Sequence, residues 1–195
     1  MNAELLQVFQ GQQDILAVEQ GMSPELIQFL QTYPFDLAQQ EQASEHYQLQ
    51  DTMNSVETML AEAGRIMATS FAECNRSYNP QVVLGMPRSG WAVAHGIADI
   101  WGIDVVYSNQ GHLADPAKPI LSNEIIARLP KQHALIADDI LWKAQQKAAL
   151  LPFLNDAIYF VPVIDRYEAR NLRTKVITCF APTNGLTDYL QRIFD

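Results

Sequence analysis

Cysteine is scarce in this sequence, which contains only Cys74 and Cys179 among its 195 residues. Two cysteines are too few for a disulfide framework, and their separation matches no metal-ligand spacing. A small disulfide-stabilised fold and a cysteine-based zinc site are therefore excluded. We expect both residues to be reduced thiols that pack as small hydrophobic side chains.

Basic residues and long apolar runs are also lacking. The sequence has 13 Lys and Arg residues but 22 Asp and Glu residues, so its formal net charge is -9. This negative charge repels the phosphate backbone of a nucleic acid. No apolar run approaches the roughly 18 residues that span a bilayer. The first residues, MNAELLQVFQGQQD, lack the basic start and apolar centre of a signal peptide. We expect no nucleic-acid or membrane partner and a cytoplasmic location.

The first 40 residues are rich in Gln but carry Leu, Ile and Phe at helical spacing. Ser23 and Pro24 are typical of a helix start, with Ser as the N-cap and Pro in the first turn. Pro34 disfavours a helical conformation at Tyr33, so the pattern predicts two short helices, the second ending there. We therefore expect an N-terminal helical extension over residues 1–40 and a core domain over residues 41–195.

The core pattern indicates an α/β fold. Between Asp51 and Asn75, apolar residues recur every three or four positions and predict one long helix with an apolar stripe. After Pro80, short apolar runs alternate with helical stretches. Strands are predicted near 81–84, 103–108, 133–138, 157–165 and 175–180, and helices near 91–101, 144–154 and 183–194. This alternation predicts a mostly parallel central sheet with helices on both faces.

Ligands of such sheets bind beyond the carboxyl ends of the strands, where this sequence carries three polar turns. Gly85 to Gly90, GMPRSG, joins a strand to a helix. Its glycines permit a tight turn, and its amides and Arg88 can hold a phosphate. An ordinary strand-to-helix turn with a solvated arginine is the alternative.

Asp138 and Asp139 follow another strand. Adjacent carboxylates repel each other, and a cation or a pair of hydroxyls between them relieves that repulsion. The alternative is a helix N-cap beside a solvated neighbour. Asp165 and Arg166 form the third turn, where Arg166 can grip a planar carboxylate or a heteroaromatic carbonyl edge; a surface ion pair is the alternative.

The order of these turns resembles the phosphoribosyltransferase family of type I fold, and the orotate branch most closely. The resemblance rests on PQVVLGMPRSGWAVAHGIADIWGIDVVY, HALIADDILWKAQQKAALLPFL and YFVPVIDRYEA, and it covers about residues 43–195. It implies that Asp138 and Asp139 contact the ribose hydroxyls of phosphoribosyl pyrophosphate, with Tyr47 and Arg166 on the base side. It also implies a pyrophosphate loop made of Gly85, Met86, Pro87, Arg88 and Ser89. A 5-phosphate loop is implied as well, made of Ile140, Leu141, Trp142, Lys143, Ala144, Gln145 and Gln146.

The resemblance further implies that Mg²⁺ comes with the sugar donor, without a direct protein ligand, and that the protein forms a homodimer. The sequence departs from the family in the 5-phosphate loop, where the family has two threonines and a glycine and this chain has Trp142, Lys143 and Ala144. Hydroxyl and amide donors for a phosphate are lost by this change. The region 109–120, which the family fills with basic residues, offers only His112 and Lys118.

Two functions follow from these observations. The first is a phosphoribosyltransferase-like protein of nucleotide metabolism. Its reaction would be pentosyl transfer, and the altered 5-phosphate loop predicts that catalysis is weak or lost. The alternative is a non-catalytic protein on the same fold that binds a nucleotide or a phosphorylated sugar and acts in regulation. A third interpretation, an unrelated Rossmann-like nucleotide protein, lacks the expected GxGxxG motif.

Overall fold

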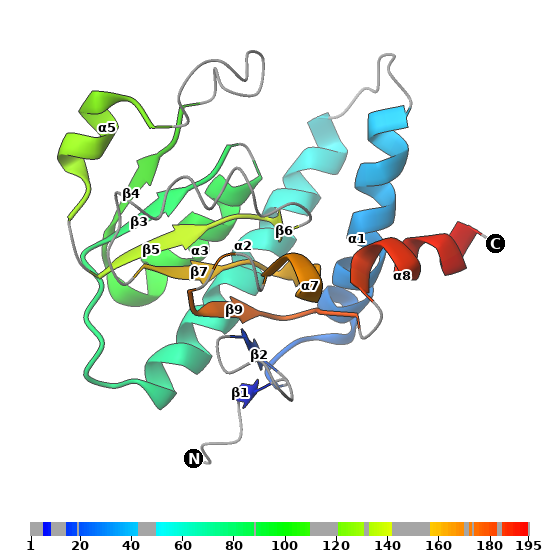
Figure 1. The fold of residues 1–195 in the computed structure, drawn as a ribbon, viewed down its shortest axis with the longest axis horizontal. Helices are drawn as coiled ribbons and strands as arrows, with labels where there is room; N and C mark the ends of the chain where they lie inside the picture. Colours follow the sequence, from blue (N-terminus) through cyan, green and yellow to red (C-terminus); the bar gives the residue numbers. More distant parts are fainter. Residues whose placement is uncertain are drawn as a thin grey trace.

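The computed structural model describes residues 6–8, 15–18, 20–42, 50–87, 89–109, 121–130, 133–141, 157–169, 172, 174–182 and 185–194. Within these ranges, the centre of the molecule is a seven-stranded sheet (Figure 1). From edge to edge its strands are β1 (Leu6–Val8), β2 (Ile15–Val18), β9 (Val176–Thr178), β7 (Ile158–Phe160), β5 (Ala134–Ala137), β3 (Val82–Gly85) and β4 (Asp104–Tyr107). Every neighbouring pair is parallel except β1 and β2, so the predicted α/β class and mostly parallel sheet are confirmed.

The central strands β3, β5, β7 and β9 bury both of their faces, because successive side chains point to opposite sides of a strand. Val83, Leu135, Phe160 and Ile177 belong to one apolar cluster, with the helices α2 (Gln50–Cys74) and α3 (Gly90–Trp101). Their sequence neighbours in the same strands belong to a second cluster on the other face, formed by Val82, Leu84, Ala134, Ile136, Tyr159 and Val176. The predicted helices on both faces follow from this arrangement.

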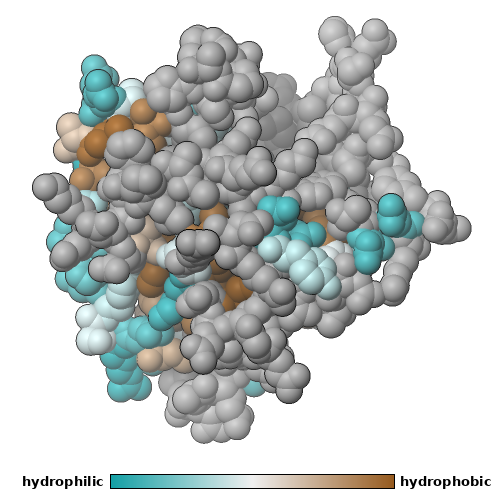
Figure 2. Space-filling model, viewed as in Figure 1, coloured by the Kyte–Doolittle hydropathy of each residue, from teal (hydrophilic) through white to brown (hydrophobic). Residues whose placement is uncertain are grey.

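Further helices pack around the sheet. The second face is covered by α5 (Asn123–Arg128) and by the residues around α7 (Arg166–Ala169). Ser122 caps α5 by accepting a hydrogen bond from the Ile125 amide at 3.3 Å. Figure 2 shows apolar side chains gathered over α5. α1 (Pro24–Gln42) and α8 (Gly185–Phe194) lie side by side, and the Tyr189 hydroxyl donates to the Gln31 carbonyl at 3.1 Å (Figure 1).

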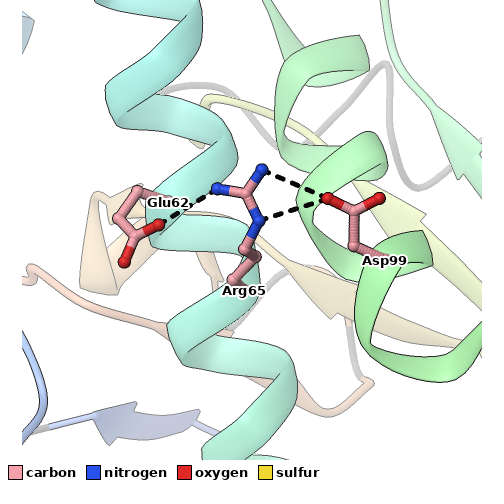
Figure 3. A network of polar contacts seen from close by, with 3 residues as sticks. All are labelled: Glu62, Arg65 and Asp99. Carbon is pink, nitrogen blue, oxygen red and sulfur yellow. Dashed lines mark hydrogen bonds and ion pairs between the residues drawn. The ribbon is translucent and has the colours of Figure 1, made fainter.

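The helices α2 and α3 pack with unusually close backbones. A Cβ atom on Gly64 would collide with the Val93 carbonyl oxygen, and one on Gly96 would collide with the Ala61 carbonyl oxygen. Two glycines on facing helices therefore permit the contact. Beside it, Arg65 of α2 pairs with Glu62 at 3.0 Å and with Asp99 of α3 at 3.1 Å (Figure 3).

The predicted core elements between residues 50 and 141 are present within a few residues of their expected bounds. The predicted strand over 157–165 is instead two short strands, β7 and β8 (Val163–Ile164), separated by Pro162. Pro162 has no amide hydrogen, and its carbonyl accepts bonds from the Cys179 and Phe180 amides at 3.1 and 2.8 Å. β8 pairs with β6 (Ile140–Leu141) in a separate two-stranded ladder. The predicted helix over 144–154 lies outside the described residues.

The prediction for the first 40 residues was wrong in two details. The first of the two short helices is replaced by β1 and β2, because β2 completes the edge of β9 and buries Ile15 and Val18 on the two faces of the sheet. The second helix does not end at Tyr33, since α1 continues through Pro34 to Gln42. Buried Leu26, Leu30 and Tyr33 hold this helix on the core and outweigh the one backbone bond that Pro34 lacks. None of the described helices is long and apolar enough to cross a membrane.

Candidate functional site

The candidate site lies at the carboxyl ends of β3 and β5, which are neighbours at the centre of the sheet. From β3 the chain continues outward to β4, whereas from β5 it continues to β7 on the opposite side. The strand order therefore reverses between β3 and β5. In open α/β sheets, the crevice outside such a reversal is the usual place for a ligand.

The two carboxylates Asp138 and Asp139 follow β5 directly. Asp138 is 4% exposed, and its amide continues the sheet by donating to the Phe160 carbonyl at 3.1 Å. Its Oδ1 accepts a hydrogen bond from the Asp139 amide at 3.0 Å. The next residues, Ile140 and Leu141, form β6 and not a helix, so the alternative interpretation of this pair as a helix N-cap is wrong.

The turn between β3 and α3 is packed against this acid pair. The Met86 amide donates to the Ala137 carbonyl at 2.8 Å. A Cβ atom on Gly90 would lie 2.8 Å from Asp138 Cα and 3.2 Å from Asp138 Oδ1, so only glycine fits there. Ser108 fixes the start of the turn, since its amide and hydroxyl both donate to the Gly85 carbonyl, at 3.0 and 2.9 Å. The predicted phosphate turn and the predicted acid pair are thus neighbours.

Ser89 carries a hydroxyl that α3 does not use. Ser89 precedes the first residue of this helix, but its side chain makes no capping hydrogen bond and its backbone is already helical, with φ -66° and ψ -28°. Its hydroxyl interacts with that of Tyr33. Pro87 is partly exposed beside it, and Arg88 lies outside the described residues.

Tyr33 reaches the acid pair from α1. Its hydroxyl donates to Asp139 Oδ2 at 2.6 Å, and only 3% of the residue is exposed. Burial raises the pKa of Tyr33, and the negative charge and hydrogen bond of Asp139 raise it further, whereas the Ser89 hydroxyl acts in the opposite direction. The phenol therefore stays neutral and remains a hydrogen-bond donor to the carboxylate.

Sequence reasoning missed the role of Tyr33, which it treated only as the residue before a proline. The available signal was its position in the apolar stripe of α1, three residues after Leu30 and seven after Leu26. A tyrosine on a buried stripe needs a partner for its hydroxyl. The identity of that partner was not visible, because 106 positions separate Tyr33 from Asp139.

A second phenol lies close enough to Asp138 to feel its charge. Tyr159 of β7 is completely buried, and burial together with the charge of Asp138 raises its pKa. Two neutral phenols therefore lie near the two carboxylates. The Tyr33 hydroxyl donates to this largely buried acid pair, and such a hydrogen bond offsets part of the free-energy cost of burying a carboxylate.

Asp165 has a structural function. It is 6% exposed, and its Oδ1 accepts hydrogen bonds from the Tyr167 and Glu168 amides at 2.8 and 3.2 Å, which caps α7. Its Oδ2 accepts a bond from the Leu186 amide of α8 at 2.8 Å. Arg166 begins α7, but its side chain lies outside the described residues. Its role on the base side stays a prediction.

The other predicted site residues are only partly within the described structure. Of the predicted 5-phosphate loop, Ile140 and Leu141 pair with β8 as a strand. The rest of that loop, from Trp142 to Gln146, lies outside the described residues, as does Tyr47. Among the residues that the structure does describe, no group of three or more His, Cys, Asp or Glu side chains can hold a metal ion.

Comparison with known proteins gives matches to solved structures alone. No family model matches the sequence, and no curated protein matches it. The structure is similar to that of TT1426 from Thermus thermophilus, with 18% identity, a TM-score of 0.48 and coverage of 65% of this chain and 85% of that one. It is also similar to a purine phosphoribosyltransferase from Pyrococcus horikoshii, with 16% identity, a TM-score of 0.41 and coverage of 62% and 87%. These likenesses concern the fold alone.

Proposed function

We propose that this chain is a phosphoribosyltransferase-like protein that binds a phosphorylated sugar or a nucleotide at the carboxyl ends of β3 and β5. The observation that supports it best is the hydrogen bond from a hydroxyl to Asp139 Oδ2 at 2.6 Å. In this bond the carboxylate accepts a hydroxyl of Tyr33, which supports the proposal that it can accept a ligand hydroxyl. The ribose diol of a sugar phosphate offers two such donors to the Asp138 and Asp139 pair.

The neighbouring turn suits the phosphate part of the same ligand. Gly90 brings the start of α3, a twelve-residue helix, against Asp138. Helix N-termini favour anions through their free amides and the helix dipole. A ligand with a diol and a phosphate a few ångströms apart matches both halves of the site.

The reaction that the sequence resemblance implies is pentosyl transfer. A nucleobase nitrogen would attack the anomeric carbon of phosphoribosyl pyrophosphate, the bond from that carbon to the pyrophosphate oxygen would break, and pyrophosphate would leave. Mg²⁺ would neutralise the leaving group, bound to the donor's own oxygens. Because Trp142, Lys143 and Ala144 replace the family's phosphate-binding residues, we propose that catalysis is weak or lost.

The second candidate is a non-catalytic protein that binds a nucleotide or sugar phosphate on the same fold. It is favoured by Tyr33, which comes from outside the transferase-like segment and already uses one carboxylate oxygen of the pair. Both candidates bind the same ligand, but only the first converts it to product. A homodimer, a cytoplasmic location and a place in nucleotide metabolism accompany both candidates as predictions.

Titration calorimetry on the full chain tests the shared ligand. We expect phosphoribosyl pyrophosphate with Mg²⁺ to bind, and the double variant Asp138→Asn, Asp139→Asn to weaken binding at least tenfold, since the ligand diol then loses its charge-assisted hydrogen bonds to both carboxylates. Asp99→Asn is the matched control, because Asp99 is an exposed acid on α3 that pairs with Arg65 outside the site. Absence of heat at millimolar donor in the wild-type chain would contradict the proposal.

Pyrophosphate release separates the two candidates. The assay uses the same chain with phosphoribosyl pyrophosphate, Mg²⁺ and either orotate or a purine base. Orotate comes first because the sequence resembles the orotate branch most closely. Release above the rate without protein supports the weak enzyme, whereas binding without release supports the regulatory protein.

A further inference from the structure

Tyr33 lies where a ligand hydroxyl would approach Asp139. Its oxygen is 2.6 Å from Asp139 Oδ2, the short distance typical of a hydroxyl bound to a carboxylate. The aromatic ring behind that oxygen fills the direction from which the hydrogen bond comes. A second hydroxyl cannot take the same position unless the phenol moves away.

The helix that carries Tyr33 is anchored before this residue by buried side chains and by a hydrogen bond from α8. Leu26 and Leu30 are each 1% exposed, and the Tyr189 hydroxyl of α8 holds the Gln31 carbonyl at 3.1 Å. Pro34 then follows inside the helix and cannot donate to the Leu30 carbonyl. The backbone ladder of α1 is therefore interrupted directly after Tyr33, which is a usual place for a helix to bend.

These contacts differ from those that only support the core. The carboxylate partner of Tyr33 belongs to the acid pair at the strand reversal, and the phenol also interacts with Ser89 of the adjacent turn. One side chain thus engages both halves of the site. Tyr189, by comparison, joins α1 to α8 through a backbone carbonyl and has no contact of this kind.

We infer that Tyr33 is a built-in competitor for the ligand: it occupies Asp139 Oδ2, and a ligand hydroxyl that binds this oxygen must replace it. The inference rests on the proposed function, because it assumes that Asp139 receives a ligand hydroxyl. Opening requires Tyr33 to leave the apolar cluster in which it packs with Leu26 and Leu30. Pro34, which is also buried, marks the interrupted place in the helix where such a movement can occur. The site then favours ligands that offer a hydroxyl able to displace the phenol from Asp139 Oδ2.

Tyr33→Phe tests the competition by removing the hydroxyl and keeping the ring. Titration calorimetry with phosphoribosyl pyrophosphate and Mg²⁺ should show binding about tenfold tighter than in the wild-type chain. In the variant, ligand binding does not have to break the hydrogen bond between Tyr33 and the Asp139 carboxylate. Tyr189→Phe is the matched control, since it also removes a phenol bond of α1, and its affinity should stay within about twofold of wild type. Circular dichroism establishes that both variants are folded.

A second measurement follows the helix itself. Saturating phosphoribosyl pyrophosphate should speed amide hydrogen exchange in the segment 33–42 of the wild-type chain and leave the segment 24–30 unchanged. Equal affinity of the wild-type and Tyr33→Phe chains would overturn the inference alone. Weaker binding by Tyr33→Phe would also overturn it, because the phenol would then help to hold the ligand. No binding by either chain would overturn the proposed function, and the inference with it.

Discussion

Asp165 shows how much one buried carboxylate can organise. Its two oxygens accept three backbone amide bonds, two from α7 and one from the start of α8. The neighbouring Gly185 has a φ of 81°, and a Cβ there would lie 2.9 Å from the Tyr167 ring. The turn after β8 and the last helix are thus joined at one residue.

Asp165→Ala should lower the free energy of unfolding by about 2–4 kcal/mol, since it removes a helix cap and leaves buried amides without an acceptor. Asp165→Asn keeps one acceptor oxygen and should lose less. Urea unfolding monitored by circular dichroism measures both. A loss below about 0.5 kcal/mol in the alanine variant would contradict the capping role.

The two cysteines differ in exposure, and we expect them to differ in reactivity. Cys74 is exposed, whereas burial raises the pKa of the Cys179 thiol from 9.0 to about 12. Only the thiolate is a nucleophile, so iodoacetamide at pH 8 should label Cys74 in the native chain and leave Cys179 unlabelled, as read by peptide mass spectrometry. Equal labelling of the two cysteines would contradict this expectation.

The raised pKa of Cys179 also determines how the stability of the fold changes with pH. Between pH 9 and 12 the thiol ionises in the unfolded chain but stays protonated in the folded one. The unfolded state then binds fewer protons, and stability falls as the pH rises through this window. Below pH 9 both states are protonated, so the contribution is fully present.

At the scale of elements, the contact between α2 and α3 depends on two glycines. Gly96→Ala should destabilise the protein by at least about 2 kcal/mol, because a backbone carbonyl cannot yield as a flexible side chain can. Gly102→Ala is the comparison: it has open space but a φ of 63°, so we expect a loss of about 1 kcal/mol from backbone strain. Thermal unfolding of both variants checks the order, and a smaller loss for Gly96→Ala would contradict it.

The ion pairs beside this contact contribute much less. The Arg65 side chain is 40% exposed while it pairs with Glu62 and Asp99, so water and salt screen both interactions. Arg65→Met should change the free energy of unfolding by less than about 1 kcal/mol, and the difference should shrink further in 1 M salt. A larger, salt-insensitive loss in urea unfolding would show that packing of the side-chain stem matters more.

At the scale of the whole molecule, the sheet is completed from the beginning of the chain. β2 pairs with β9 in parallel, and Ile15 and Val18 are buried at 2% and 1% exposure. The same N-terminal region supplies α1 and therefore Tyr33 to the candidate site. The first 42 residues thus contribute to both the sheet and the site.

A chain that starts at residue 21 should be markedly less stable. Removing β1 and β2 exposes the edge of β9, and the buried side chains of Ile15 and Val18 each contribute about 1.5–3 kcal/mol. Urea unfolding and size-exclusion chromatography should reveal a lower midpoint and self-association through the open edge. The point variant Val18→Ala should give a smaller loss without self-association. Unchanged stability of the shortened chain would contradict this account.

The sequence by itself determined the parallel α/β core and the position of the acid pair. Alternating apolar residues, a glycine-rich turn and Asp138-Asp139 at a strand end are local signals, and backbone chemistry translates them directly into strands, turns and helix starts. The sequence could not reveal that β2 joins β9, that α1 continues past Pro34, or that Tyr33 bonds to Asp139. Only the tertiary structure decided these contacts, because each depends on which distant surfaces meet, and burial then outweighs the local preferences of the chain.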